Sequence, residues 1–78
     1  MDKLNIGIVG VGRIGQRHAS IVHDLANLVA VCDIDEELVN FVSSKYGCNG
    51  YHSISDLLKN EWTIDLLSIC TPNGYHAE

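Results

Sequence analysis

The chain has 78 residues, 46% of them apolar, and a formal net charge of −5. This composition indicates one folded domain, because disordered chains combine low hydrophobicity with high net charge. Five basic residues are too few for the clustered charge of a nucleic-acid-binding protein, and no apolar run approaches the roughly 18 residues of a membrane span. We therefore expect neither nucleic acid nor a membrane as a partner.

The N-terminus and the cysteines favour a cytoplasmic protein. Met1 to Leu4 leads directly into a strand pattern, without the charged and apolar regions of a secretory signal. The three cysteines (Cys32, Cys48 and Cys70) are widely spaced and form no Cys-x-x-Cys pair, so neither a disulfide framework nor a zinc site is expected. We expect buried or structural thiols and no metal.

Short apolar runs and segments of helical period alternate along the first half of the chain. A strand is predicted at 4–9, where apolar residues recur at period two. In the helix that follows, one stripe at helical spacing is expected to face the core: Ile14, Ile21 and Leu25, with His18 among them. The continuous apolar run at 28–32 predicts a strand covered on both faces, as in a parallel sheet.

The second half continues the alternation. An acidic start at 33–37 precedes a helix that Gly47 ends, and a weak strand is predicted at 48–51. Ser53 and Asp56 resemble a capping box that opens a short helix through Lys59. The last strand is predicted at 64–70, before the turn-forming Thr71-Pro72-Asn73-Gly74.

This order predicts an α/β fold, a partial doubly wound parallel sheet of the Rossmann type with about four strands and helices on both faces. A Rossmann domain usually carries about six strands. We therefore expect residues 1–78 to be the N-terminal part of a longer dinucleotide-binding domain, with any substrate domain absent from this chain.

A Gly-x-Gly-x-x-Gly motif lies between the first strand and the first helix. Gly10 would permit the tight turn, Gly12 the approach of a pyrophosphate, and Gly15 close packing of the helix against the sheet. Backbone N–H groups near Arg13 and Ile14, together with the helix dipole, would hold the phosphate charge. Arg13 itself either lies along the pyrophosphate or points to solvent. The alternatives are a glycine turn without a ligand and a Rossmann site for FAD or S-adenosylmethionine.

Asp33 follows the second strand, eighteen residues after Gly15. A carboxylate there accepts hydrogen bonds from the adenosine ribose and repels a 2′-phosphate, so NAD is favoured over NADP. The other interpretation is that Asp33 only caps the next helix. Three histidines are given no role in binding or catalysis. His18 is interpreted as a packing residue, and His23 and His52 as surface or loop residues.

The motif Gly-x-Gly-Arg-Ile-Gly-x-x-His-Ala, the strand end Val31-Cys32-Asp33 and the run from Ser68 to His76 resemble the glucose–fructose oxidoreductase, inositol dehydrogenase and MocA-like family over essentially the whole chain. The resemblance implies an NAD(P)-dependent oxidoreductase that transfers hydride to or from a sugar, polyol or sugar-derivative hydroxyl and is a homo-oligomer at full length. It also implies that Thr71, Pro72 and Asn73 line the nicotinamide-side ribose, with His76 nearby. Without a ligand, these residues would be a strand-ending turn and a helix-surface histidine.

The family's Glu-Lys-Pro motif and its later Asp and His, which form the catalytic apparatus, have no counterpart in this chain. We therefore assign no catalytic residue here. Two functions remain open: the cofactor-binding part of a sugar or polyol dehydrogenase, and a non-catalytic NAD-binding sensor or regulatory module.

Overall fold

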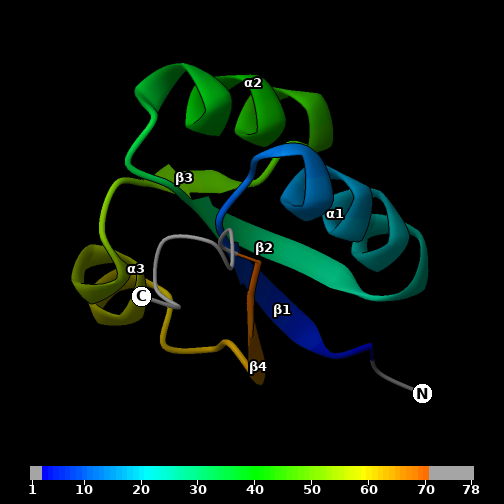
Figure 1. The fold of residues 1–78 in the computed structure, drawn as a ribbon. Helices are drawn as coiled ribbons and strands as arrows, with labels where there is room; N and C mark the ends of the chain where they lie inside the picture. The colour runs from blue at the N-terminus through cyan, green and yellow to red at the C-terminus, as the bar shows by residue number, and fades with distance from the viewer. Residues whose placement is uncertain (1–2, 71–78) are drawn as a thin grey trace, which may run out of the picture.

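The computed structural model describes residues 3–70, which form a four-stranded parallel sheet with helices on both faces (Figure 1). The elements follow one another as β1 (Asn5–Val9), α1 (Arg13–Leu25), β2 (Asn27–Cys32), α2 (Glu36–Tyr46), β3 (Asn49–Tyr51), α3 (Ile54–Asn60) and β4 (Leu66–Ile69). The strand order is β3-β2-β1-β4, and every neighbouring pair is parallel. The chain thus winds outward from β1 to β3 and crosses back to the other side of β1, which confirms the predicted fold class.

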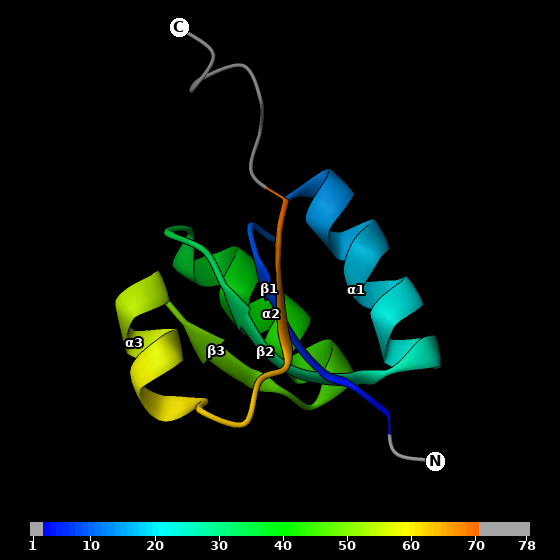
Figure 2. The same ribbon diagram turned by 90° about the horizontal axis from the view of Figure 1, so that it is seen from below.

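Two apolar layers cover the two faces of the sheet. The layer under α1 and α2 is built from Ile8, Val11, Ala19, Val31, Val39 and Val42. The layer under α3 is smaller and is built from Val9, Ala30, Cys32 and Leu57. Figure 2 shows α1 and α3 on opposite sides of the strands. Because β1 and β2 are buried on both faces, their ends are held firmly where a ligand of such a sheet binds.

The predicted core face of α1 is wrong. Ile14, Ile21 and Leu25 are 64%, 51% and 74% exposed, and His18 is exposed as well. The helix instead buries Gly15 and Ala19 against the sheet. Small residues let the helix axis approach the strands closely, and the large side chains of the neighbouring stripe are left outside this contact. The helical period was predicted correctly, but the buried face was not.

The ends of the later helices agree with the sequence signals. Asp35 caps α2, because its Oδ1 accepts the N–H groups of Glu37 and Leu38 at 3.0 and 3.3 Å. Gly47 ends the same helix in the left-handed region, with φ of 67°. Ser53 caps α3 by accepting the N–H of Asp56 at 3.1 Å. The strand predicted at 64–70 is shorter in the structure and runs from Leu66 to Ile69.

The remaining structural expectations concern thiols, metals and membranes. Cys32 is buried, Cys48 and Cys70 are partly buried, and all three are free thiols. Burial raises the pKa of the Cys48 thiol to about 11, which keeps it protonated and weakly reactive. Within residues 3–70 no cluster of side chains could hold a metal ion. None of the helices in this part of the chain has the length and apolarity needed to cross a membrane.

Candidate dinucleotide-binding site

A cleft of about 1000 Å³ opens at the carboxyl ends of β1, β2 and β4. Its lining includes the glycine loop, the first turn of α1, the segment after β2 and the loop between β3 and α3. Ligands of open parallel sheets bind at this edge, where the strand order reverses direction on either side of β1. The cleft therefore lies where the fold itself predicts a binding site.

Gly10 lines the cleft, and Gly15 packs directly against it. Gly10 has φ of 92°, a backbone conformation that favours glycine, and its N–H donates to the carbonyl oxygen of Cys32 at 2.7 Å. A Cβ added to Gly15 would overlap the carbonyl oxygen of Gly10 and lie 2.7 Å from the carbonyl carbon. Gly15 is thus required for the contact between α1 and the loop, in agreement with the predicted close packing.

Gly12 has a different environment. It precedes α1 with φ of −72°, and a Cβ added to it would meet nothing within 4 Å. The fold itself does not need glycine at this position, whereas a ligand lying against this backbone would. No side chain caps α1 here, and its first turn carries no acidic residue. The N–H groups and the positive end of the helix dipole are consequently available to a phosphate group.

Asp33 lies beside this loop and is already engaged by the backbone. Its Oδ2 accepts the N–H of Val11 at 2.9 Å, and its Oδ1 accepts the N–H of Asp35 at 2.9 Å. An ionised carboxylate offers about four acceptor positions, so about two remain for the hydroxyls of a ribose. The alternative interpretation, in which Asp33 caps the next helix, is wrong, because Asp35 is the cap of α2.

The wall of the cleft beyond Asp33 was not identified from the sequence. It includes Ile34 and Leu38 from the segment after β2 and the first half of α2, together with His52, Ser53 and Ile54 from the loop and helix start that follow β3. Ile34 is 92% exposed, although it is a large apolar residue next to a polar site. This wall suits a flat, partly apolar group such as a purine. The position of residues 52–54 in the sequence could have indicated this wall. These residues follow β3, which is parallel to β2, so they lie at the same end of the sheet as Asp33.

Arg13 and Ile14 form the exposed first turn of α1 at the rim of the cleft. This placement is compatible with both interpretations of Arg13. Thr71, Pro72, Asn73 and His76 lie outside the described residues. Among the lysines in this part of the chain, Lys45 and Lys59 are in the last turns of α2 and α3, and Lys3 precedes β1. None of these three follows the carboxyl end of a strand, as expected from the sequence.

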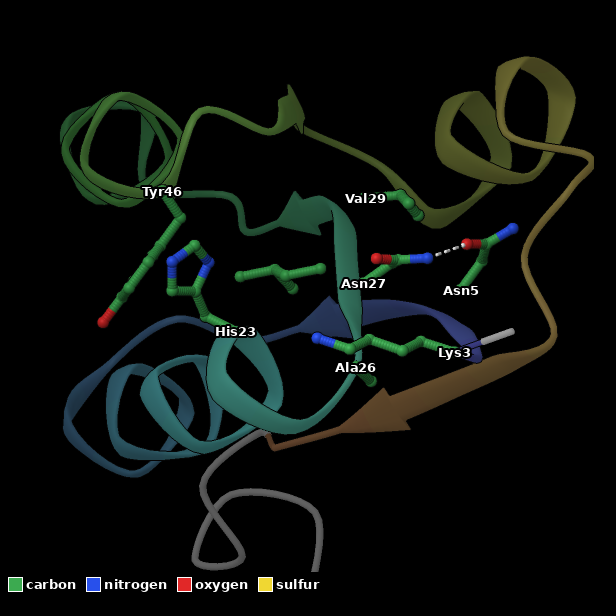
Figure 3. A pocket seen from close by; sticks show the side chains of 8 residues that line it. Lys3, Asn5, His23, Ala26, Asn27, Val29 and Tyr46 are labelled. Carbon is green, nitrogen blue, oxygen red and sulfur yellow. Dashed lines mark hydrogen bonds between the residues drawn. The ribbon is translucent and has the colours of Figure 1, made fainter. Parts of the chain in front are cut away.

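A second, smaller depression of about 400 Å³ lies at the other end of the strands, where β1 and β2 begin (Figure 3). There the rings of His23 and Tyr46 contact each other with centroids 4.9 Å apart, and Asn27 donates to Asn5 at 3.0 Å. Lys45 is in the last turn of α2, where the helix dipole favours positive charge, and its Nζ lies 5.5 Å from the centre of the Tyr46 ring. These side chains are therefore engaged with one another.

Taken together, the fold and the cleft define a dinucleotide-binding protein of the Rossmann class. A family model described as "Oxidoreductase family, NAD-binding Rossmann fold" matches residues 4–78. The chain belongs to this family, which includes glucose–fructose oxidoreductases, inositol dehydrogenases and MocA proteins.

Curated relatives carry more specific names. The chain is 36% identical over 77 residues to an inositol 2-dehydrogenase of Rhizobium meliloti, covering 96% of this chain and 23% of the relative. It is 30% identical over 76 residues to a UDP-N-acetylglucosamine 3-dehydrogenase of Acidithiobacillus ferrooxidans, with 97% and 23% covered. The chain thus spans about a quarter of the length of the curated relatives it matches.

Solved structures agree with the fold. The scyllo-inositol dehydrogenase of Lactobacillus casei, crystallised with NAD(H) and scyllo-inositol, superposes with a TM-score of 0.83 at 26% identity, covering 96% of this chain and 23% of the other. The WlbA dehydrogenase of Bordetella pertussis, in complex with NADH and UDP-GlcNAcA, gives 0.83 at 33% identity, with 96% and 22% covered.

Proposed function

We propose that this chain is the NAD-binding part of a dehydrogenase that transfers hydride between the cofactor and a hydroxyl of a sugar, polyol or nucleotide sugar. The observation that carries the proposal is the convergence of three features on one cleft: the Gly10–Gly15 loop, the uncapped start of α1 and the Asp33 carboxylate. Each feature matches one part of a dinucleotide.

The residues of the chain bind and orient the cofactor. The backbone between Gly12 and Ile14 would hold the pyrophosphate, because its N–H groups and the helix dipole favour negative charge. Asp33 would accept the hydroxyls of the adenosine ribose, while its bond to Val11 keeps the loop in shape. When bound, NAD supplies the nicotinamide ring that accepts or donates hydride. By family resemblance, Thr71, Pro72, Asn73 and His76 would lie at the nicotinamide end.

NAD is proposed over NADP because the segment after β2 is acidic. Asp33, Asp35 and Glu36 stand together, and no Lys or Arg follows Asp33 until Lys45. A 2′-phosphate placed beside Asp33 would meet a carboxylate, and the segment after β2 offers no cation to compensate it. The names of the relatives favour inositols and UDP-linked amino sugars as substrates of the whole protein.

The proposal is tested on the whole protein that contains this chain. We expect it to bind NAD and to produce NADH, followed at 340 nm, with at least one member of a panel of sugars, inositols and nucleotide sugars. Absence of NAD binding would overturn the proposal. Tight binding of NAD with no turnover across the panel would favour the sensor or regulatory module instead.

A further inference from the structure

We propose that Glu61 and Tyr51 form a positioning pair that holds Asp33 in place at the adenosine end of the cleft. This inference rests on the proposed function, because it assigns the pair a role in binding the adenosine half of NAD. Neither side chain lines the cleft itself. Both act through the backbone of Tyr51, which is the last residue of β3.

The first contact joins β3 to the end of α3. The Tyr51 hydroxyl donates to Oε2 of Glu61 at 2.6 Å, and the Asn49 side-chain amide donates to the same oxygen. The hydrogen bond to Glu61 raises the pKa of Tyr51 to about 12, so the phenol keeps its proton at every physiological pH. β3 has three residues and pairs with β2 alone among the described strands. Such a short edge strand gains little from its own ladder and depends on side-chain anchors.

The second contact joins β3 to Asp33. The carbonyl oxygen of Tyr51 accepts the N–H of Asp33 at 3.1 Å. The carboxylate of Asp33 then accepts the N–H of Val11 in the glycine loop. Three hydrogen bonds, connected through the covalent frames of Tyr51 and Asp33, thus link Glu61 to Val11. Movement of Tyr51 would shift the backbone from which the ribose-binding carboxylate extends.

Tyr51 also supports the wall of the cleft formed by residues 52–54. His52, Ser53 and Ile54 follow Tyr51 directly and line the cleft at its adenosine end. Anchoring Tyr51 therefore holds this wall as well as Asp33. The glycine loop is reached only at Val11 and only through Asp33, so the effect on Gly12 and the first turn of α1 should be smaller than the effect on Asp33 itself. Loss of the pair should consequently impair binding of adenosine-containing ligands more than binding of the nicotinamide half.

The pair can be removed without removing the packing of α3. Leu57 is fully buried among Val9, Ala30 and Cys32 and anchors the helix independently of Glu61. Tyr51→Phe keeps the ring and deletes only the hydroxyl. Glu61→Ala removes the acceptor, whereas Glu61→Gln keeps a neutral acceptor at the same position. Tyr46→Phe is the matched control, since it deletes a tyrosine hydroxyl at the other end of the strands.

The experiment measures the dissociation constants of NAD, of ADP-ribose (the adenosine half) and of reduced nicotinamide mononucleotide, NMNH (the nicotinamide half), for the whole protein and these variants. It also measures the hydrogen-exchange rate of the Asp33 amide. We expect Tyr51→Phe and Glu61→Ala to weaken NAD and ADP-ribose about three- to tenfold, as for one lost hydrogen bond, and to leave NMNH unchanged. Exchange at Asp33 should accelerate in both variants. Glu61→Gln and Tyr46→Phe should resemble the parent, and the double variant should add nothing to either single one.

Unchanged affinity for ADP-ribose in Tyr51→Phe, or an equal loss for NMNH, would overturn the positioning role. A parent protein that binds neither NAD nor ADP-ribose would overturn the proposed function together with this inference. A parent that binds both, with Tyr51→Phe indistinguishable from it, would overturn the inference alone.

Discussion

Asp33 supports the glycine loop through its bond to Val11, and we propose that it also selects the cofactor. We predict that the whole protein binds NAD at least about tenfold more tightly than NADP, because like charges brought together cost several kcal/mol. Asp33→Ser combined with Ile34→Arg should shift this preference toward NADP by removing a negative charge and adding a positive one. Total affinity should also fall, since the bonds to Val11 and Asp35 are lost.

Titrations with both cofactors measure this preference. Asp33→Asn serves as the control, because it removes the charge and keeps an oxygen acceptor at the same position. Equal affinity of the parent for NAD and NADP would contradict the assignment of Asp33.

Gly12 is predicted to matter for the ligand and not for the fold. A side chain at this position has open space, and φ of −72° suits any residue. Gly12→Val should therefore fold with the parent's melting temperature while losing several kcal/mol of NAD binding through steric exclusion of the pyrophosphate. Calorimetric titration and thermal melting measure the two effects separately. Normal NAD binding by a folded Gly12→Val protein would place the phosphates elsewhere.

Gly15 is predicted to behave in the opposite way. Its added Cβ would overlap the backbone carbonyl of Gly10, which has no flexible end that can move aside. Gly15→Ala should cost about 3 kcal/mol of unfolding free energy, at the upper end for overpacked sites. Chemical denaturation of Gly15→Ala beside Gly12→Ala compares the same added methyl group at two nearby glycines. Equal stability of the two variants would show that α1 does not approach the loop as closely as described.

At the scale of elements, the apolar pattern of α1 predicted a helix correctly but did not predict which face of that helix is buried. Ala19 is fully buried against the sheet, whereas Ile21 is half exposed. We predict that Ala19→Leu destabilises the whole protein by about 1–3 kcal/mol through overpacking, and that Ile21→Gln changes its stability by only about 0.5 kcal/mol. Urea denaturation of the whole protein and the two variants measures both. A larger loss of stability in Ile21→Gln than in Ala19→Leu would indicate that α1 buries the face of Ile14, Ile21 and Leu25 after all.

At the scale of the whole molecule, we predict that no residue of 3–70 supplies the acid or base for hydride transfer from an alcohol. Such a reaction needs a group within hydrogen-bonding reach of the reacting hydroxyl. Within the described strands β4 also pairs only with β1, and an exposed strand edge promotes association. We predict that the 78 residues alone associate, bind NAD weakly or not at all, and turn over no sugar or polyol.

Sedimentation and NADH production at 340 nm, measured side by side for the chain and for the whole protein, test this prediction. Turnover by the 78 residues alone would place the catalytic base within them. The assignment of that base to residues beyond this chain would then be wrong.

Much of this protein is determined by local sequence. Alternating apolar runs specify the parallel sheet, and Asp35, Gly47 and Ser53 set helix ends through backbone geometry and short-range hydrogen bonds. The glycine spacing and Asp33 predict the pyrophosphate and ribose ends of the cleft from local sequence as well, since each requirement belongs to a few neighbouring residues.

Tertiary structure decided what depends on distant parts of the chain. Ala19 rather than Ile21 is buried because the closeness of α1 to the sheet is set by Gly10 and Gly15, not by the helix's own pattern. The wall at 52–54 and the link from Glu61 through Tyr51 to Asp33 arise only when β3 pairs with β2 and α3 folds back beside it. No local pattern marks these residues, because their contacts are made by strands and helices that meet only in the folded chain.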